Sequence, residues 1–276
     1  MRVVVNLMLA AAVAYAVILL LVFLFQPRLV YFPQVEREYA TTPRAADLDF
    51  EDVVLHPADG IKLHGWWAPA RGARGTVLLM HGNAGNISHR LGYLTMFNRL
   101  GYSVLLFDYR GYGKSGGNPG EEGTYRDAEA AWQHLTEARK VRAREIVIIG
   151  ESLGGGVATW LALKYPPRAL VLASTFTSVP DLGAQIYPWL PVRLLARVKY
   201  DNLERIGKIA APVLIAHSRE DEIIPFAHSE ALLAAAREPR ELLVLAGGHN
   251  VGFLYARDDW VAAVGAFLER AAAATH

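Results

Sequence analysis

The stretch Gly-Glu-Ser-Leu-Gly at residues 150–154 constrains the fold more than any other part of this chain. The run before it, residues 145–149, is largely β-branched and apolar, as is typical of a strand buried on both faces, and residues 157–164 after it are rich in helix formers. Ser152 is therefore expected on a tight strand-to-helix turn, where the flanking glycines let the two elements crowd together. Chance spacing is the alternative, and the strand before and helix after argue against it.

Strand and helix patterns alternate along most of the remaining chain. An antiparallel hairpin is predicted first, from residues 50–56 and 62–68 around an Asp-Gly turn. Further strands are expected at 76–80, 103–107, 145–149, 169–173, 212–217 and 241–245, with helices near 88–100, 125–139, 157–164, 226–237 and 255–270. Alternation of buried strands with helices predicts an α/β fold with a mostly parallel, doubly wound sheet covered on both faces.

Composition excludes several classes of function. With 28 basic and 27 acidic residues among 276, the chain has no charge excess that would favour nucleic acid. It has no cysteine, which excludes disulfides, thiol catalysis, thiolate metal sites and S-acylated anchoring. Its length suits one large domain with a substantial core.

The N-terminal segment from Val3 to Phe25 carries no charged residue. A helix of that length can cross about 30 Å of hydrocarbon. A cleaved signal peptide is the alternative, because residues 14–16 (Ala-Tyr-Ala) resemble a cleavage site, but the apolar run continues beyond them. We therefore expect an uncleaved single-pass anchor that contacts the lipid bilayer through residues 3–25.

The sequence divides into three expected parts. These are an anchor at 1–27, a polar, proline-punctuated connector at 28–49, and a catalytic domain at 50–276. The charges flanking the anchor determine its orientation poorly, and an extracytoplasmic catalytic domain is favoured. The sequence gives no indication of oligomeric state.

A serine hydroxyl is a weak nucleophile that needs a base, itself oriented by a third group. Asp221 follows the strand predicted at 212–217, and His249 follows the strand predicted at 241–245. The carboxyl ends of parallel strands meet at one edge of a sheet, so these side chains are expected near Ser152. The chain order of serine, then acid, then histidine is that of α/β-hydrolase triads.

Other residues compete for two of these roles. His81 and His217 also end predicted strands, but both stand in the wrong order for the base. Glu220 and Glu222 flank Asp221, and spacing alone does not separate the three carboxylates as candidates for the acid.

An oxyanion hole needs backbone N–H groups that point at the reacting carbonyl. One is expected from Leu153, directly after the serine, and the second from Asn83 in the glycine-containing loop at 81–86. A plain Gly-Asn turn is the alternative reading of that loop.

Residues 175–211 form a connection longer than the sheet requires, and many of them are apolar. We interpret the segment as a small lid over Ser152 that could accept an acyl chain. The candidate substrate contacts are Phe176, Tyr187, Trp189 and Leu190. The alternative is that these side chains complete the core beneath a crossover helix.

Together these motifs resemble the α/β-hydrolase superfamily, and within it the small membrane-anchored α/β-hydrolase domain-containing proteins related to protein depalmitoylases and to serine aminopeptidase-like lipases. The resemblance runs from Arg28 to the end of the chain. It rests on the anchor followed by residues 28–33, on 81–86, 108–115, 123–127 and 150–154, and on Asp221 and His249-Asn250. The chain departs from those relatives in lacking an N-terminal cysteine cluster and in carrying Val251 where an acidic residue is common.

The resemblance implies the triad of Ser152, Asp221 and His249, oxyanion donors at Asn83 and Leu153, and no metal or organic cofactor. The function expected is hydrolysis of carboxylic ester or thioester bonds of acyl or lipid-like substrates through an acyl-enzyme. A serine peptidase using the same residues is one alternative, and a catalytically silent membrane-tethered scaffold is another. Haloalkane dehalogenation is disfavoured because the turn carries serine where that chemistry needs a carboxylate.

Overall fold

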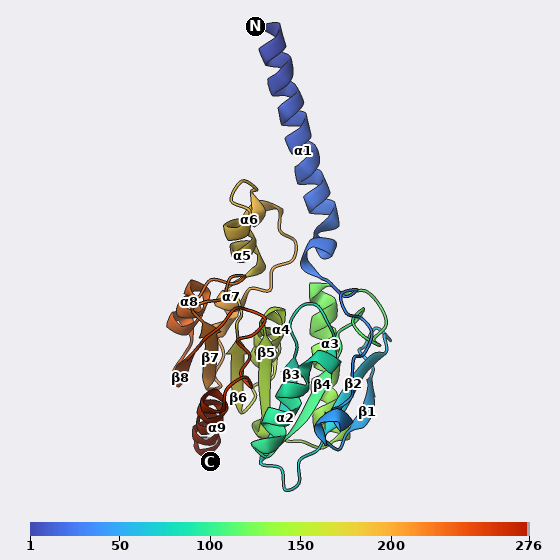
Figure 1. Ribbon diagram of the computed structural model, residues 1–276, viewed down its shortest axis with the longest axis vertical. Coiled ribbons are helices and arrows are strands. Elements are labelled where there is room, and N and C mark those ends of the chain that lie inside the picture. The colour runs from blue at the N-terminus through green and yellow to red at the C-terminus, as the bar shows by residue number, and fades with distance from the viewer. Residues whose placement is uncertain (275–276) are drawn as a thin grey trace.

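The computed structural model describes residues 1–274 and is built around an eight-stranded sheet (Figure 1). The strand order is β1-β2-β4-β3-β5-β6-β7-β8. The strands are β1 (Glu51–Leu55), β2 (Leu63–Ala68), β3 (Gly75–Met80), β4 (Tyr102–Phe107), β5 (Ile146–Glu151), β6 (Ala169–Ala173), β7 (Val213–Ser218) and β8 (Arg240–Leu245).

The sheet is mostly parallel, which confirms the predicted fold class. From β4 through β8 every pairing is parallel, whereas β2 pairs antiparallel with β1 and β4. The predicted N-terminal hairpin is β1 and β2, with Glu51 opposite Trp67 and Leu55 opposite Leu63. All central parallel strands therefore direct their carboxyl ends to one edge of the sheet.

Helices cover both faces of the sheet. The longer ones are α1 (Arg2–Val30), α2 (Leu91–Arg99), α3 (Glu121–Gln133), α4 (Leu153–Lys164), α5 (Val179–Ile186), α8 (Ala227–Ala235) and α9 (Asp258–Ala273), and the shorter are α6 (Val192–Leu195) and α7 (Asn202–Ile206). One apolar core joins the sheet to α3, α4, α7 and α8, and the other joins it to α2 and α9. Alternate residues of β5 enter the two cores, as expected of a strand buried on both faces.

Helix α4 begins four residues earlier than its composition suggests. Propensity pointed to residues 157–164, but α4 starts at Leu153 and includes three consecutive glycines at 154–156. Glycine is a poor helix former. Here close packing favours it, because a Cβ at Gly156 would lie 2.6 Å from the ring of Tyr200.

The N-terminal helix α1 projects away from the sheet, and α5 and α6 rise on the same side of the molecule (Figure 1). By length and composition α1 could cross a membrane, as a membrane anchor or a signal sequence would. It runs to Val30 with a kink at Phe25, two residues before Pro27. Proline removes a backbone donor and crowds the preceding turn, which explains a kink at this position.

Candidate active site

Ser152 lies on the strand-to-helix turn between β5 and α4, in a strained conformation. Its φ of 51° is in the left-handed region, which a residue with a side chain seldom adopts. The two flanking glycines explain how the turn closes. A Cβ at Gly150 would lie 2.6 Å from Cβ of Ala158, and one at Gly154 would lie 2.2 Å from the carbonyl oxygen of Met80. The turn therefore exists in this form only because glycine stands at both positions.

The structure brings Ser152, His249 and Asp221 together at the carboxyl edge of the sheet. Nε2 of His249 lies 3.1 Å from Oγ of Ser152, and Nδ1 of His249 lies 2.7 Å from Oδ2 of Asp221. These are hydrogen-bond distances, and they connect a nucleophile, a base and an orienting acid in that order. The arrangement can activate the serine hydroxyl for attack on a carbonyl carbon.

Asp221 is held as a carboxylate. Burial favours its neutral form, but hydrogen bonds from His217, His249 and the N–H of Ile224 hold the pKa of Asp221 well below its usual value. Oδ1 also accepts the N–H groups of Ile223 and Ile224, at 2.9 and 2.8 Å. These bonds fix the carboxylate so that Oδ2 faces the imidazole of His249.

His217 supports the acid rather than the nucleophile. Its Nε2 lies 3.1 Å from Oδ2 of Asp221 and 2.9 Å from the carbonyl oxygen of Ile224, and its side chain is fully buried. His81, the other histidine that competed by position, is also fully buried. Burial, followed by the charge of Arg90, lowers the pKa of His81 to about 3, so its ring is neutral.

The two glutamates beside Asp221 contact the backbone of the loop that carries the histidine. Glu222 accepts the N–H of His249 at 2.9 Å, and Glu220 accepts the N–H of Gly247 at 2.9 Å. They hold the histidine loop in place while Asp221 contacts the ring. The sequence left three carboxylates open as candidates for the acid. The geometry favours Asp221, because Asp221 contacts the ring of His249 whereas the two glutamates contact backbone N–H groups.

The side chain of Asn83 joins the loop after β3 to the end of α1. Its amide nitrogen donates to the carbonyl oxygen of Val30 at 2.6 Å, and its Oδ1 accepts the N–H of Phe32 at 3.1 Å and the hydroxyl of Tyr112 at 2.6 Å. Leu153 opens α4, so its N–H has no partner within the helix. Asn83 and Leu153 both line the cavity that contains Ser152.

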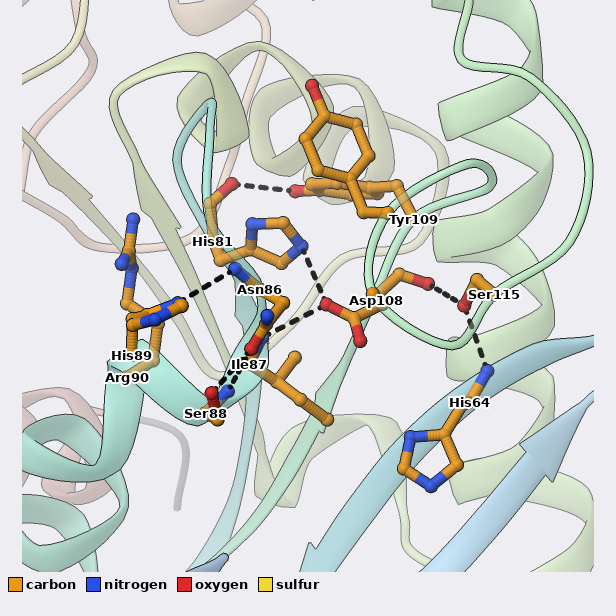
Figure 2. Close-up of polar contacts among 12 residues, drawn as sticks. His64, His81, Asn86, Ile87, Ser88, His89, Arg90, Asp108, Tyr109 and Ser115 are labelled. Carbon is orange, nitrogen blue, oxygen red and sulfur yellow. Dashed lines mark hydrogen bonds and ion pairs between the residues drawn. The ribbon is translucent and has the colours of Figure 1, made fainter. Parts of the chain in front are cut away.

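A buried polar network joins the loop at 81–90 to Asp108, Tyr109 and Ser115 (Figure 2). At its centre Asp108 accepts the N–H of Ile87 at 3.0 Å through Oδ1, while its backbone carbonyl accepts the hydroxyl of Ser115 at 2.7 Å. The hydroxyl of Tyr109 donates to the carbonyl oxygen of His81 at 3.2 Å. Burial, partly offset by hydrogen bonds from Tyr39 and Ile87, raises the pKa of Asp108 to about 6. The loop is therefore built to keep one shape.

An ion pair that borders the same cavity as Ser152 was not anticipated from the sequence. Arg90 Nη2 lies 3.0 Å from Oε1 of Glu151, and both side chains are largely buried. Glu151 is the variable second residue of the Gly-Glu-Ser-Leu-Gly turn, and Arg90 precedes α2 far away in the chain. The sequence carries no local signal for the pair, because the two residues are 61 positions apart. It ties the turn to the loop at 81–90.

A cavity of about 680 Å³ opens onto Ser152 and His249. All four residues proposed from the sequence as substrate contacts border it, namely Phe176, Tyr187, Trp189 and Leu190. Phe176 and Leu190 are buried, whereas Tyr187 and Trp189 are exposed. The segment 175–211 was interpreted either as a lid or as part of the core. In the structure α5 and α6 border the cavity, and α7 contributes Ile206 to the core.

The opposite wall of the cavity comes from the N-terminal helix, which the sequence did not indicate. Val22, Gln26, Leu29 and Val30 of α1 line the same cavity as Ser152. Within residues 1–274, no group of three or more histidine, aspartate or glutamate side chains converges as a metal site would require.

Comparisons with known proteins identify relatives of this chain. Residues 71–201 match the family model described as serine aminopeptidase, S33. The chain is 44% identical over 230 residues to an uncharacterized protein of Mycobacterium tuberculosis, covering 82% of this chain and 80% of that protein. It is 35% identical over 241 residues to the alpha/beta hydrolase domain-containing protein WAV2 of Arabidopsis thaliana, covering 78% of each.

Solved structures have the same architecture. The esterase Pf2001 of Pyrococcus furiosus superposes with a TM-score of 0.70 at 25% identity, covering 83% of this chain and 93% of that one. The esterase domain of a Rhodothermus marinus protein superposes with a TM-score of 0.63 at 19% identity, covering 82% of this chain and 99% of the domain, and shares the fold.

Proposed function

This chain belongs to the α/β-hydrolase superfamily and is a hydrolase by that relationship, and we propose that it is a membrane-anchored serine esterase acting on acyl substrates. The observation that carries the proposal is the continuous contact from Ser152 through His249 to Asp221, at 3.1 and 2.7 Å, facing a largely apolar cavity. An apolar cavity with a few converging polar groups suits an acyl chain attached to a reactive carbonyl.

In the first half-reaction Oγ of Ser152 attacks the substrate carbonyl carbon while Nε2 of His249 takes the hydroxyl proton. The Nδ1–H of His249 donates to Asp221, whose carboxylate stabilises the imidazolium. The N–H groups of Asn83 and Leu153 stabilise the negative charge on the carbonyl oxygen. Collapse of this intermediate breaks the carbon–oxygen bond to the leaving alcohol, which receives the proton from His249 and leaves the acyl group on Ser152.

Water completes the cycle. His249 removes a proton from a water molecule, and the resulting hydroxide attacks the acyl carbonyl. The acid is released as Oγ of Ser152 recovers its proton from His249. A thioester passes through the same steps with a thiol as the leaving group. No step needs a metal or an organic cofactor.

Peptidase activity is a second candidate, because the family model that matches residues 71–201 is described as serine aminopeptidase. Amide hydrolysis would use the same three residues and the same oxyanion donors. The apolar character of the cavity favours an acyl ester over a charged peptide terminus.

The test is labelling of the detergent-solubilised full chain with a fluorescent fluorophosphonate, beside Ser152→Ala and His249→Ala. We expect labelling of the wild type and loss of labelling in both variants, with unchanged urea unfolding. Short-chain esters, thioesters and aminoacyl amides are then compared by kcat/KM. Absence of labelling in a folded wild type would contradict an activated serine, and preferential cleavage of aminoacyl amides would favour the peptidase.

A further inference from the structure

Hydrogen bonds join α1 to the segment that contains α5 and α6 at two positions along the helix, Tyr15 and Gln26. The side-chain amide of Gln26 donates to the carbonyl oxygen of Leu195 at 2.6 Å and accepts the N–H of Arg197 at 2.7 Å. Further toward the N-terminus, the hydroxyl of Tyr15 donates to the carbonyl oxygen of Trp189 at 2.8 Å. Gln26 and Tyr15, which make these contacts, lie about 16 Å apart along the axis of α1.

That distance places the segment at membrane depth if α1 spans a bilayer. Tyr15 lies near the middle of the uncharged run from Val3 to Phe25. About 16 Å is roughly half of a hydrocarbon core of about 30 Å. If α1 spans the membrane, the loop around Trp189 therefore lies within the leaflet next to the domain.

The surface of this segment suits such a position. Residues 182–192 contain no charged side chain. Ile186, Trp189 and Leu194 are 49%, 58% and 87% exposed, so their apolar side chains have little protein covering them. Two cations flank this stretch. Arg193 pairs with Asp181 of α5 at 3.0 Å, and the guanidinium of Arg197 lies over the ring of Phe23 in α1, 4.7 Å from its centroid. Exposed apolar groups gathered beside an apolar helix are typical of a surface that contacts lipid.

The cavity of the active site reaches the same region. Val22, Gln26 and Leu29 of α1, on both sides of the kink at Phe25, all border the cavity that holds Ser152. Val22 belongs to the uncharged run itself. Helices α5 and α6 form the facing wall. The cavity therefore extends from the serine to the depth of the proposed membrane span.

We propose that the active-site cavity opens laterally into the bilayer between α1 and α5–α6, and that its substrate is an ester of a long acyl chain resident in that membrane. The acyl chain enters between Val22 and the facing helices, which brings its carbonyl to Ser152. The anchor is then one wall of the acyl-binding site. This inference rests on the proposed esterase function and adds the source of the substrate and its route.

The experiment uses the full chain in phosphatidylcholine vesicles. It compares hydrolysis of 4-methylumbelliferyl oleate, carried in the bilayer, with hydrolysis of 4-methylumbelliferyl butyrate, supplied from water. Val22→Trp should obstruct the route, so we expect the oleate-to-butyrate rate ratio to fall at least tenfold. Leu24→Trp is the matched control, because Leu24 is on the same helix but does not border the cavity. Its ratio should stay within twofold of the wild type.

The outcomes separate the two proposals. If the wild type hydrolyses neither ester, the esterase function fails. If it hydrolyses both but Val22→Trp and Leu24→Trp give the same ratio, lateral entry alone is overturned. Hydrolysis of butyrate without oleate also overturns it. Leu29→Trp, on the lining face, repeats the test should Val22→Trp not fold.

A second measurement examines depth without catalysis. Phosphatidylcholine brominated in the middle of its acyl chains quenches tryptophan fluorescence only on contact. We expect such vesicles to quench the wild type, and Trp189→Phe to lose at least half of that quenching. Equal quenching in the two proteins would overturn the placement of α5–α6 in the leaflet, whatever the activity.

Discussion

The two sides of the active-site cavity are built in contrasting ways. On the side of the sheet, Ser152, Asp221 and His249 are fixed by short hydrogen bonds from buried backbone and side chains. On the side of α1, α5 and α6, exposed apolar side chains dominate, and few hydrogen bonds join the elements. In the function that we propose, the side of the sheet breaks the bond, and the side of α1, α5 and α6 selects the substrate.

The sharpest test of the sheet side is to change two neighbouring carboxylates. Asp221→Asn should reduce kcat by about 10⁴-fold, because the amide no longer stabilises the imidazolium and can favour the wrong tautomer of His249. Glu222→Gln, which retains an acceptor for the N–H of His249, should cost less than about tenfold. Both are measured with a water-soluble short-chain ester.

Equal losses in the two variants would mean that Asp221 has no special role. A larger loss in Glu222→Gln would transfer the role of the acid to Glu222. Near-native urea unfolding of both variants serves as the control for folding.

Asn83 links the two sides, so its removal should affect both. Asn83→Ala removes the hydrogen bonds to Val30 and Phe32 and lets the oxyanion loop relax. We expect kcat to fall by about 10- to 100-fold, less than the ~10²–10³ typical of losing an oxyanion donor outright. Asn98→Ala is the matched control, because among residues 1–274 the side chain of Asn98 donates only to the carbonyl oxygen of Pro69. A change in KM alone would place Asn83 in substrate binding rather than in support of the oxyanion hole.

Truncation of Trp189 should change the preference for acyl-chain length and have little effect on the rate of the chemical step. Its side chain is 58% exposed, so Trp189→Ala should leave the unfolding midpoint close to that of the wild type. We expect the ratio of kcat/KM for long-chain over short-chain esters to fall about three- to tenfold, because apolar contact with the acyl chain is lost. Lower stability with an unchanged ratio would instead mean that Trp189 belongs to the core.

The smallest expected effect is a pH dependence of stability. The folded-state pKa of Asp221 lies below the ~3.9 of an unfolded aspartate, so its ionisation stabilises the fold above about pH 4. This contribution is lost as the pH falls through the folded pKa. The difference in unfolding free energy between wild type and Asp221→Asn should therefore narrow from pH 7 to pH 3. A constant difference would show that the carboxylate is not stabilised by its neighbours.

The sheet side was largely predictable from the sequence, and the outer side was not. Strand periodicity and chain order predicted that Ser152, Asp221 and His249 would lie near one another, because parallel strands bring their carboxyl ends to one edge, and the three side chains are in contact. The distinction between Asp221 and its flanking glutamates needed coordinates, since neighbouring residues of a loop point in different directions.

Contacts on the outer side depend on residues far apart in the chain. Tyr15 and Trp189 are separated by 174 positions, and Gln26 and Leu195 by 169. Nothing local in an apolar run signals which of its faces meets another element. The pair of Arg90 and Glu151 escaped prediction for the same reason.

The side chain of Gln26 has a consequence for how this protein could evolve or be engineered. A tether that served only to hold an enzyme at a membrane could be replaced by another hydrophobic segment or by a lipid group. The side chain of Gln26 hydrogen-bonds the backbone of Leu195 and Arg197, and the nearby Val22 and Leu29 border the cavity that contains Ser152. In the function that we propose, the same helix holds the protein at the membrane and forms one wall of the acyl-binding site, so exchanging the first thirty residues should change the substrate preference.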